Sequence, residues 1–129
     1  EPMGVDFDYK PGVGPVLQKP IRTYSDVEEL RAVHIEEQLA FTGSSLAALK
    51  SELNIPCIGF IGAPFTLASY MIEGGPSKNY RFLKSFMYTQ TKAWNLLMNK
   101  LTDLLSDCKC SIIEHIYISA LIVSTINHL

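Results

Sequence analysis

The residues whose types could form a ligand-binding site lie between Gly59 and Gly75, in the stretch GFIGAPFTLASYMIEGG. Tyr70 combines an apolar ring with a hydroxyl that seeks a polar partner, and Phe60 can present a flat ring as a wall. Gly62 lacks a Cβ, so a flat ligand or another backbone segment can come close to it. These residue types predict one wall of a ligand pocket. The alternative is that the rings only pack in the core and the glycines only form turns.

Basic residues follow the double glycine of this stretch. Lys78, Arg81 and Lys84 lie near the expected start of a helix capped by Ser77. The N-terminus of a helix favours anions, which fits a pocket for an anionic ligand. A basic trio is ordinarily a solvated helix face, however, and we treat these cations as surface residues.

The cysteines do not predict a metal centre. Cys57 lies in an apolar run, where a free thiol behaves as a small hydrophobe. Cys108, Cys110 and His115 contain three zinc-ligand types, but the usual spacing with a second ligand pair is absent. We therefore expect free thiols, a reducing compartment and no metal.

The composition is that of an ordinary globular domain. The chain has 129 residues, of which 47% are hydrophobic and 19% charged, and this length predicts one domain. The net charge of −2, without a cluster of basic residues, argues against nucleic-acid binding. The first residues are acidic and mixed, unlike a signal peptide. Because the chain begins with Glu1 and not methionine, we expect it to be a piece of a longer protein.

Helices and one buried strand must position these residues. Residues 1–22 are predicted to be loop, with GPVLQK as the one strand candidate. Ser25 and Glu28 form a capping-box pattern that predicts the start of a helix over YSDVEELRAV. A second helix is predicted over SLAALKSEL, and IPCIGFIG is typical of a strand buried on both faces of a parallel sheet.

A long loop is predicted from this strand to the double glycine, followed by two helices. The first covers KNYRFLKSFMY, and the second covers residues 91–107. Their apolar stripes are predicted to face the core; they consist of Phe82, Leu83, Phe86 and Met87, and of Trp94, Leu97, Met98, Leu101, Leu104 and Leu105. This order predicts an α/β fold whose site lies at the carboxyl ends of the strands.

The amino-acid sequence of the central stretch is similar to a known family signature. GFIGAPFTLASYMIEGGPSKNY resembles GFxGAPxTLxxYMxEGGGSK of the uroporphyrinogen decarboxylase family. The segment MGVDFDYKPGVGPVLQKPIRTYSDVEEL resembles the family's G-x-GP followed by P-(I/L)-R-(T/S)-x-x-D-(V/L), and MYTQTKAWNLLMNKLTDLLSD resembles its next helix. The likeness covers about residues 2–107, and a signature of this length is highly specific.

The resemblance implies a fold and an activity. It implies an α/β fold in the form of a partial TIM (β/α)8 barrel, roughly half of the full domain, since such barrels have about 250 residues. It implies a cytoplasmic enzyme, or a plastid one if the source is a plant, that removes carbon dioxide from the four acetate side chains of uroporphyrinogen III. The product is coproporphyrinogen III, on the route to haem. No cofactor, metal or membrane is implied, and the full-length enzyme is expected to be a homodimer.

The resemblance also assigns site residues. Tyr70 matches the family's active-site tyrosine, which borders the tetrapyrrole near the reacting acetate, while Phe60 and Gly62 match positions that line the cleft. The family's catalytic aspartate and its arginine-rich substrate motif lie upstream of residue 1, so no catalytic residue is assigned here. Asp6 and Asp8 do not belong to that motif. The family's later serine and histidine are expected beyond residue 129.

Two departures from the family pattern stand out. Pro76 replaces a third glycine, which predicts a stiffer turn. Residues 108–129, CKCSIIEHIYISALIVSTINHL, lack the family's Ala-Gly-Ala and form a divergent tail to the partial domain of residues 1–107. A frameshift or misjoined exon, a true divergent terminus and an interfacial helix are the alternatives. We favour the first, because the amphipathic charge periodicity of an interfacial helix is missing.

Two other functions are compatible with parts of this sequence. The related corrinoid- and coenzyme M-dependent methyltransferases share the barrel, but the GAPFTLASYMIEGG wording favours the decarboxylase. An inactive truncated paralogue is the non-enzymatic alternative. The upstream sequence distinguishes these, because the enzyme requires the arginine-rich and aspartate motifs there.

Overall fold

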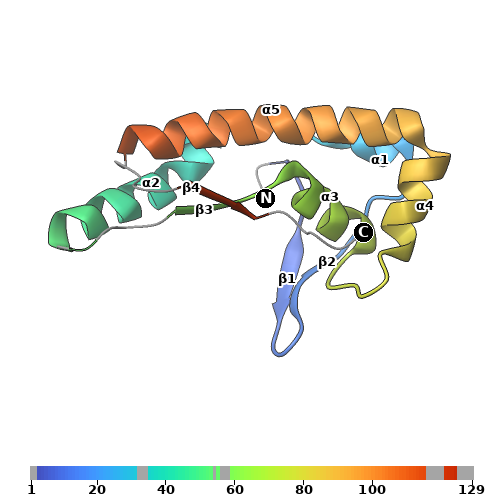
Figure 1. Ribbon diagram of the computed structural model, residues 1–129, viewed down its shortest axis with the longest axis horizontal. Helices are drawn as coiled ribbons and strands as arrows, with labels where there is room; N and C mark the ends of the chain where they lie inside the picture. The colour runs from blue at the N-terminus through green and yellow to red at the C-terminus, as the bar shows by residue number, and fades with distance from the viewer. Residues whose placement is uncertain (1–2, 32–34, 54, 56–58, 116–120, 125–129) are drawn as a thin grey trace.

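The computed structural model describes residues 3–31, 35–53, 55, 59–115 and 121–124 (Figure 1). The fold is mixed α/β, and α5 extends along one side of the other helices (Figure 1). For β4 and for parts of α2, β3 and α5, the backbone alone is described. In chain order the elements are β1 (Phe7–Lys10), β2 (Gly14–Leu17), α1 (Tyr24–Glu29), α2 (Ile35–Glu52), β3 (Gly59–Gly62), α3 (Pro64–Glu73), α4 (Arg81–Thr89), α5 (Thr91–His115) and β4 (Leu121–Ser124).

The first two strands form an antiparallel hairpin that projects from the helices (Figure 1). β2 confirms the strand candidate within GPVLQK. The prediction of loop for the rest of residues 1–22 is wrong at β1, where all four residues are exposed. A strand without a buried face shows no alternation of apolar and polar residues, so the pattern that would predict a strand is missing from β1. Gly12, at φ 74°, lies between the strands in the left-handed region that glycine adopts without strain.

The capping box of α1 lies two residues earlier than predicted. The hydroxyl of Thr23 accepts from the Asp26 amide at 3.2 Å, and the Asp26 carboxylate accepts from the Thr23 amide at 2.9 Å. The prediction of Ser25 with Glu28 is therefore wrong. Both pairs have the spacing of a capping box, but only the earlier one has its carboxylate held by a further donor, the Arg22 amide at 3.0 Å.

The second and third helices differ more from the sequence predictions. α2 covers the predicted helix except for Leu53, and it begins ten residues before Ser45, at Ile35. The strand predicted over residues 55–62 is confirmed at Gly59–Gly62 and wrong at Ile55, which lies outside the strand and is 67% exposed; residues 56–58 lie outside the described part. The prediction of a long loop is wrong, because residues 64–73 form α3. Proline at the first helical position is compatible with a helix, and the four buried residues of α3 then lie toward the core.

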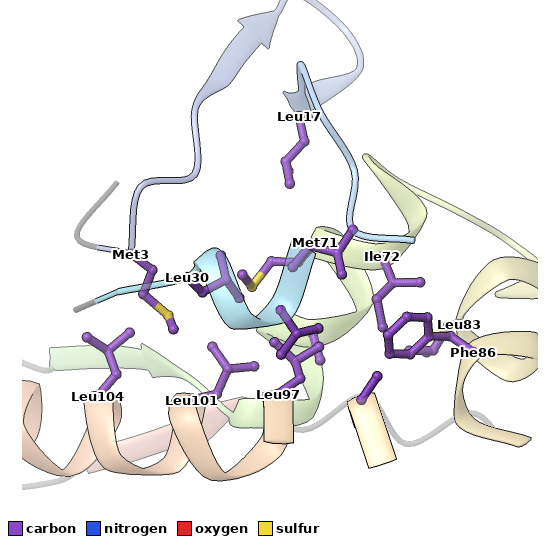
Figure 2. Packing of buried hydrophobic residues seen from close by; sticks show 14 residues of the cluster. Met3, Leu17, Leu30, Met71, Ile72, Leu83, Phe86, Leu97, Leu101 and Leu104 are labelled. Carbon is purple, nitrogen blue, oxygen red and sulfur yellow. The ribbon is translucent and has the colours of Figure 1, made fainter. Parts of the chain in front are cut away.

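The core forms where α5 packs on α3, α4 and α1 (Figure 2). Leu97, Leu101 and Leu104 of α5 are buried and point into the core cluster (Figure 2). Trp94 and Met98 are partly buried and pack against that cluster, so the stripe predicted for α5 is confirmed at these five positions. Leu105, its sixth residue, is half-buried. The stripe predicted for α4 is confirmed at Leu83 and Phe86, which are buried, and wrong at Phe82, which is 55% exposed.

Lys100 joins α5 to the end of α1. Its ammonium group donates to the carbonyl oxygens of Val27, Glu28 and Leu30 at 2.8, 3.0 and 2.7 Å. The last carbonyls of a helix have no partner within the helix and carry the negative end of its dipole. Lys100 therefore satisfies the end of α1, which contains no basic residue in its last turn.

The two remaining strands pair in parallel. Phe60 of β3 lies opposite Ile122 of β4, and Gly62 lies opposite Ser124. A parallel pair requires a crossover between its strands, and α3, α4 and α5 lie between β3 and β4 in sequence. The prediction that the central strand belongs to a parallel sheet is thus confirmed over the described residues.

Candidate functional site

The candidate site begins at the carboxyl end of β3. Ala63 has φ −66° and ψ 154°, in the extended region to which a following proline restricts a residue, and α3 begins with that proline, Pro64. A Cβ on Gly62 would lie 3.1 Å from Cδ2 of Leu67. Glycine at this position therefore allows the strand end to pack closely against the first turns of α3.

Tyr70 lies on the face of α3 that is turned away from the core. The buried residues Ala68, Met71 and Ile72 belong to the core cluster, whereas Tyr70 is half-buried and does not pack against that cluster. With about 100° per residue, Tyr70 lies on the side of the helix opposite Ala68 and Ile72. The ring therefore lies outside the core packing of α3, about 9 Å along the helix from Pro64 at 1.5 Å per residue.

Of the three predicted site residues, Gly62 lies at the junction of β3 and α3, and Tyr70 lies in the last turn of α3. The structure places the backbone of Phe60 in β3, two residues before Gly62. The side chain of Phe60 lies outside the described part of the chain.

The end of α3 is held by a segment that is distant in sequence. The carbonyl of Met71 accepts from the Ile21 amide at 2.9 Å, and that of Ile72 accepts from the Arg22 guanidinium. The Tyr70 carbonyl accepts from the Gly74 amide at 2.8 Å. These bonds satisfy carbonyls that would otherwise lack partners in the last turn. Sequence reasoning missed this arrangement, although both segments belong to the quoted family motifs.

Two glycines close the same end of the helix. Gly74 has φ 84° and would place a Cβ 2.6 Å from Cγ of Pro20. Gly75 packs next to Val16, with a Cβ position 3.6 Å from Cγ2 of that residue. The double glycine therefore lets α3 end directly against the β2 segment.

The N-terminus of α4 already has an anion. Its N-cap residue, Tyr80, has φ 48° and makes no capping bond through its side chain, but the carboxylate of Glu73 accepts from the Leu83 amide at 2.9 Å. The predicted helix start at Ser77 is wrong; the Ser77 hydroxyl instead accepts from the Tyr80 amide at 3.2 Å. The cations Lys78, Arg81 and Lys84 are exposed.

In the first turn of α1, Asp26 is the carboxyl group whose pKa is shifted. The backbone amide of Arg22, followed by the hydroxyl and amide of Thr23 and the charge of Lys19, lowers the pKa of the Asp26 carboxyl below its usual value. Burial opposes this shift. Lys19 lies 3.5 Å from Asp26 and 3.7 Å from Glu29.

Two hollows lie away from Tyr70. One of about 200 Å³ lies between the chain start and α1, and one of about 430 Å³ lies at the junction of α4 and α5. The sequence did not predict either hollow, and neither is lined by Gly62 or Tyr70. The first is lined by Met3, Gly4, Val5, Asp6, Gln18, Lys19, Pro20, Ile21, Asp26, Glu29 and Leu30.

Within the described residues, no group of three His, Cys, Asp or Glu residues is placed to hold a metal ion. The cysteine and histidine side chains considered above, of Cys57, Cys108, Cys110 and His115, lie outside the described part. Over the same described residues, no helix combines the length and apolar character that crossing a bilayer requires.

Comparison with known proteins agrees with the motifs. The profile of the family described as uroporphyrinogen decarboxylase (URO-D) matches residues 1–116. A uroporphyrinogen decarboxylase of Geobacillus sp. (strain WCH70) is 56% identical over 103 residues, which are 79% of this chain and 30% of the relative. Those of Bacillus subtilis (strain 168) and Staphylococcus aureus (strain Newman) are 53% and 52% identical over 104 residues, 80% of this chain and 30% of each relative.

The chain thus spans about 30% of the length of the curated relatives it matches, less than the half expected from barrel size. The family profile ends at residue 116, beyond the residue 107 at which we expected the likeness to stop. The motif around Tyr70, the matched profile and relatives above 50% identity lead to one conclusion: the chain belongs to the uroporphyrinogen decarboxylase family.

Proposed function

We propose that this chain is the part of a uroporphyrinogen decarboxylase that supplies the Tyr70 wall of the tetrapyrrole cleft. The observation that carries the proposal is the position of Tyr70, half-buried on the face of α3 opposite the core. The relatives named above bear the decarboxylase name. They favour this activity over the corrinoid- and coenzyme M-dependent methyltransferases.

The chemistry requires little from a protein beyond position and charge. Protonation of a pyrrole carbon makes the ring an electron sink. The bond between the acetate methylene and its carboxylate then breaks, carbon dioxide leaves and the electron pair enters the ring. Protonation of the methylene gives a methyl group, and loss of the ring proton restores the pyrrole. No cofactor is needed; the site must hold the acetate in place and shield the charged intermediate from water.

Within this scheme the chain supplies position. The Tyr70 hydroxyl would donate to the carboxylate of the reacting acetate, while Phe60 and Gly62 would line the cleft at the end of β3. The carboxylate that faces the pyrrole N–H groups and the arginines that bind the other side chains would come from other parts of the full-length enzyme.

The same proposal covers the architecture. Residues 1–107 would form part of a TIM barrel, with β3 as one barrel strand and α3 in the βα connection at its carboxyl end. The full-length enzyme would be a cytoplasmic homodimer. We retain the proposal that residues 108–129 diverge from the family by a frameshift or misjoined exon. Translation of the genomic DNA after the Asp107 codon in the other two frames tests it: an Ala-Gly-Ala strand would support it, and its absence would count against it.

A chimera tests the activity. In the Bacillus subtilis relative, the matched region of 104 residues is replaced by the aligned residues of this chain. We expect the chimera to convert uroporphyrinogen III to coproporphyrinogen III, whereas the 129 residues expressed alone aggregate and show no turnover. Unpaired strand edges and uncovered apolar faces cause the aggregation. Product chromatography and light scattering measure the two results. A folded chimera without product, or turnover by the isolated chain, would contradict the proposal.

A further inference from the structure

Arg22 joins the start of α1 to three other elements. Its guanidinium donates to the Ile72 carbonyl at the end of α3 and, at 2.9 Å, to the carbonyl of Ile21. Its Cζ lies 4.4 Å from the centre of the exposed Phe82 ring of α4. Its own carbonyl accepts from the side-chain Nε2 of Gln90 at 2.8 Å, at the junction of α4 and α5. A half-buried arginine thus fixes the end of α3 relative to its neighbours.

The guanidinium acts on the turn that contains Tyr70. Tyr70 is the fourth residue from the end of α3, so it begins the last turn. No basic residue of α3 itself lies in that turn, and the negative end of the helix dipole favours a cation there. Arg22 provides this cation and a donor at the same place. Without it the Ile72 carbonyl loses its partner, and the last turn is free to fray.

We propose that Arg22 is a positioning residue for Tyr70, which holds the last turn of α3 so that the phenolic hydroxyl meets the reacting group. The proposal rests on the proposed function, since it assigns Arg22 a role in the same site. Arg22 does not contact the substrate in this scheme; it acts through the helix end.

The structure allows the guanidinium to be tested by itself. In its bonds to the side chains of Asp26 and Gln90, Arg22 uses only its own backbone atoms, so these bonds survive replacement of the arginine side chain. Arg22→Met keeps an unbranched apolar side chain beside Phe82 and removes only the charge and the donors. Arg22→Lys keeps the charge and one donor group. Arg81→Met removes an exposed arginine of α4 and serves as the matched control.

The experiment measures kcat and KM of the chimera with each variant, with Tyr70 present and in the Tyr70→Phe background. With Tyr70 present, we expect Arg22→Met to lower kcat by about tenfold, since small misplacement of a site group is costly. KM should change by less than about twofold, because the arginine does not bind substrate. Arg22→Lys should recover most of the loss. In the Tyr70→Phe background, Arg22→Met should lower kcat no further, because residues that act through one group are not additive.

Equal losses in both backgrounds, or unchanged kcat in Arg22→Met, would overturn the proposal. If Arg22→Met does not fold, the same comparison is made with Arg22→Gln, which removes the charge but keeps a polar side chain. Hydrogen exchange gives a readout that does not need activity. The amides of Ile21 and Gly74 donate to the last turn of α3, so Arg22→Met should speed their exchange by about tenfold or more relative to the Leu101 amide in α5. Unchanged exchange would overturn the proposal even in an inactive chimera, whereas inactivity of the parent chimera alone would contradict only the proposed function.

Discussion

Replacement of Tyr70 by phenylalanine in the chimera is expected to lower kcat by about a hundredfold, the usual loss when one positioned donor to a developing charge is removed. The ring remains and continues to fill its place on α3, so KM should change little. The loss therefore reports the hydroxyl and not the packing of the ring. Steady-state rates of coproporphyrinogen formation measure it.

Tyr88 provides the matched control for this prediction. It lies on α4, 81% exposed, and Tyr88→Phe removes the same hydroxyl from a site that faces solvent. Its kcat should equal that of the parent chimera. If the kcat of Tyr70→Phe also equalled that of the parent chimera, the Tyr70 hydroxyl would have no role in the reaction. Tyr70 would then be a packing residue, and the proposed cleft wall would contain no polar group that acts on the substrate.

Replacement of Gly74 by alanine should destabilise the folded chimera by about 2–5 kcal/mol. Two costs combine: a residue with a Cβ at positive φ costs about 1–2 kcal/mol, and forcing an extra methyl group into a packed site costs about 1–3 kcal/mol. At φ 84°, the new Cβ would lie 2.6 Å from Cγ of Pro20, a ring atom that cannot rotate away. Urea unfolding followed by circular dichroism gives the change in midpoint and in free energy.

Gly12 separates the two costs. It also has positive φ, at 74°, but no atom lies within 4 Å of its Cβ position. Gly12→Ala should therefore show the backbone cost alone, about 1–2 kcal/mol. In a Pro20→Ala background the penalty of Gly74→Ala should fall toward the same value. Equal penalties for Gly12→Ala and Gly74→Ala with Pro20 present would show that the end of α3 does not press against this segment.

Local periodicity was sufficient for much of the fold. The stripe of α5 and the buried positions Leu83 and Phe86 of α4 follow from helical spacing, because a helix that packs on one side must repeat its apolar residues. Periodicity failed at Phe82, whose ring is apolar yet exposed. It lies beside the Arg22 guanidinium, and this partner comes from a segment sixty residues earlier in the chain.

The failures at the ends of elements have a similar cause. Thr23 with Asp26 and Ser25 with Glu28 fit the capping pattern equally, and the extra donor from the Arg22 backbone distinguishes them only in the folded chain. Glycine and proline on both sides of α3 favour a loop when only its local sequence is considered. Proline at the start and glycine at the end are also helix boundary signals, and in the folded chain the residues between them form a helix.

The sequence by itself determined the family, the strand that leads into the site and the apolar face of α5. Family motifs and hydrophobic periodicity are both properties of residues that are close together in the chain, so they can be recognised without the folded structure. Only the tertiary structure decided how the end of α3 is held. The Ile72 carbonyl accepts from Arg22 across fifty positions of sequence, and the Leu83 amide at the start of α4, where a helix favours an anion, donates to the carboxylate of Glu73. Such pairings depend on how the helices pack against one another, and no local pattern encodes which distant donor an unpaired carbonyl will find.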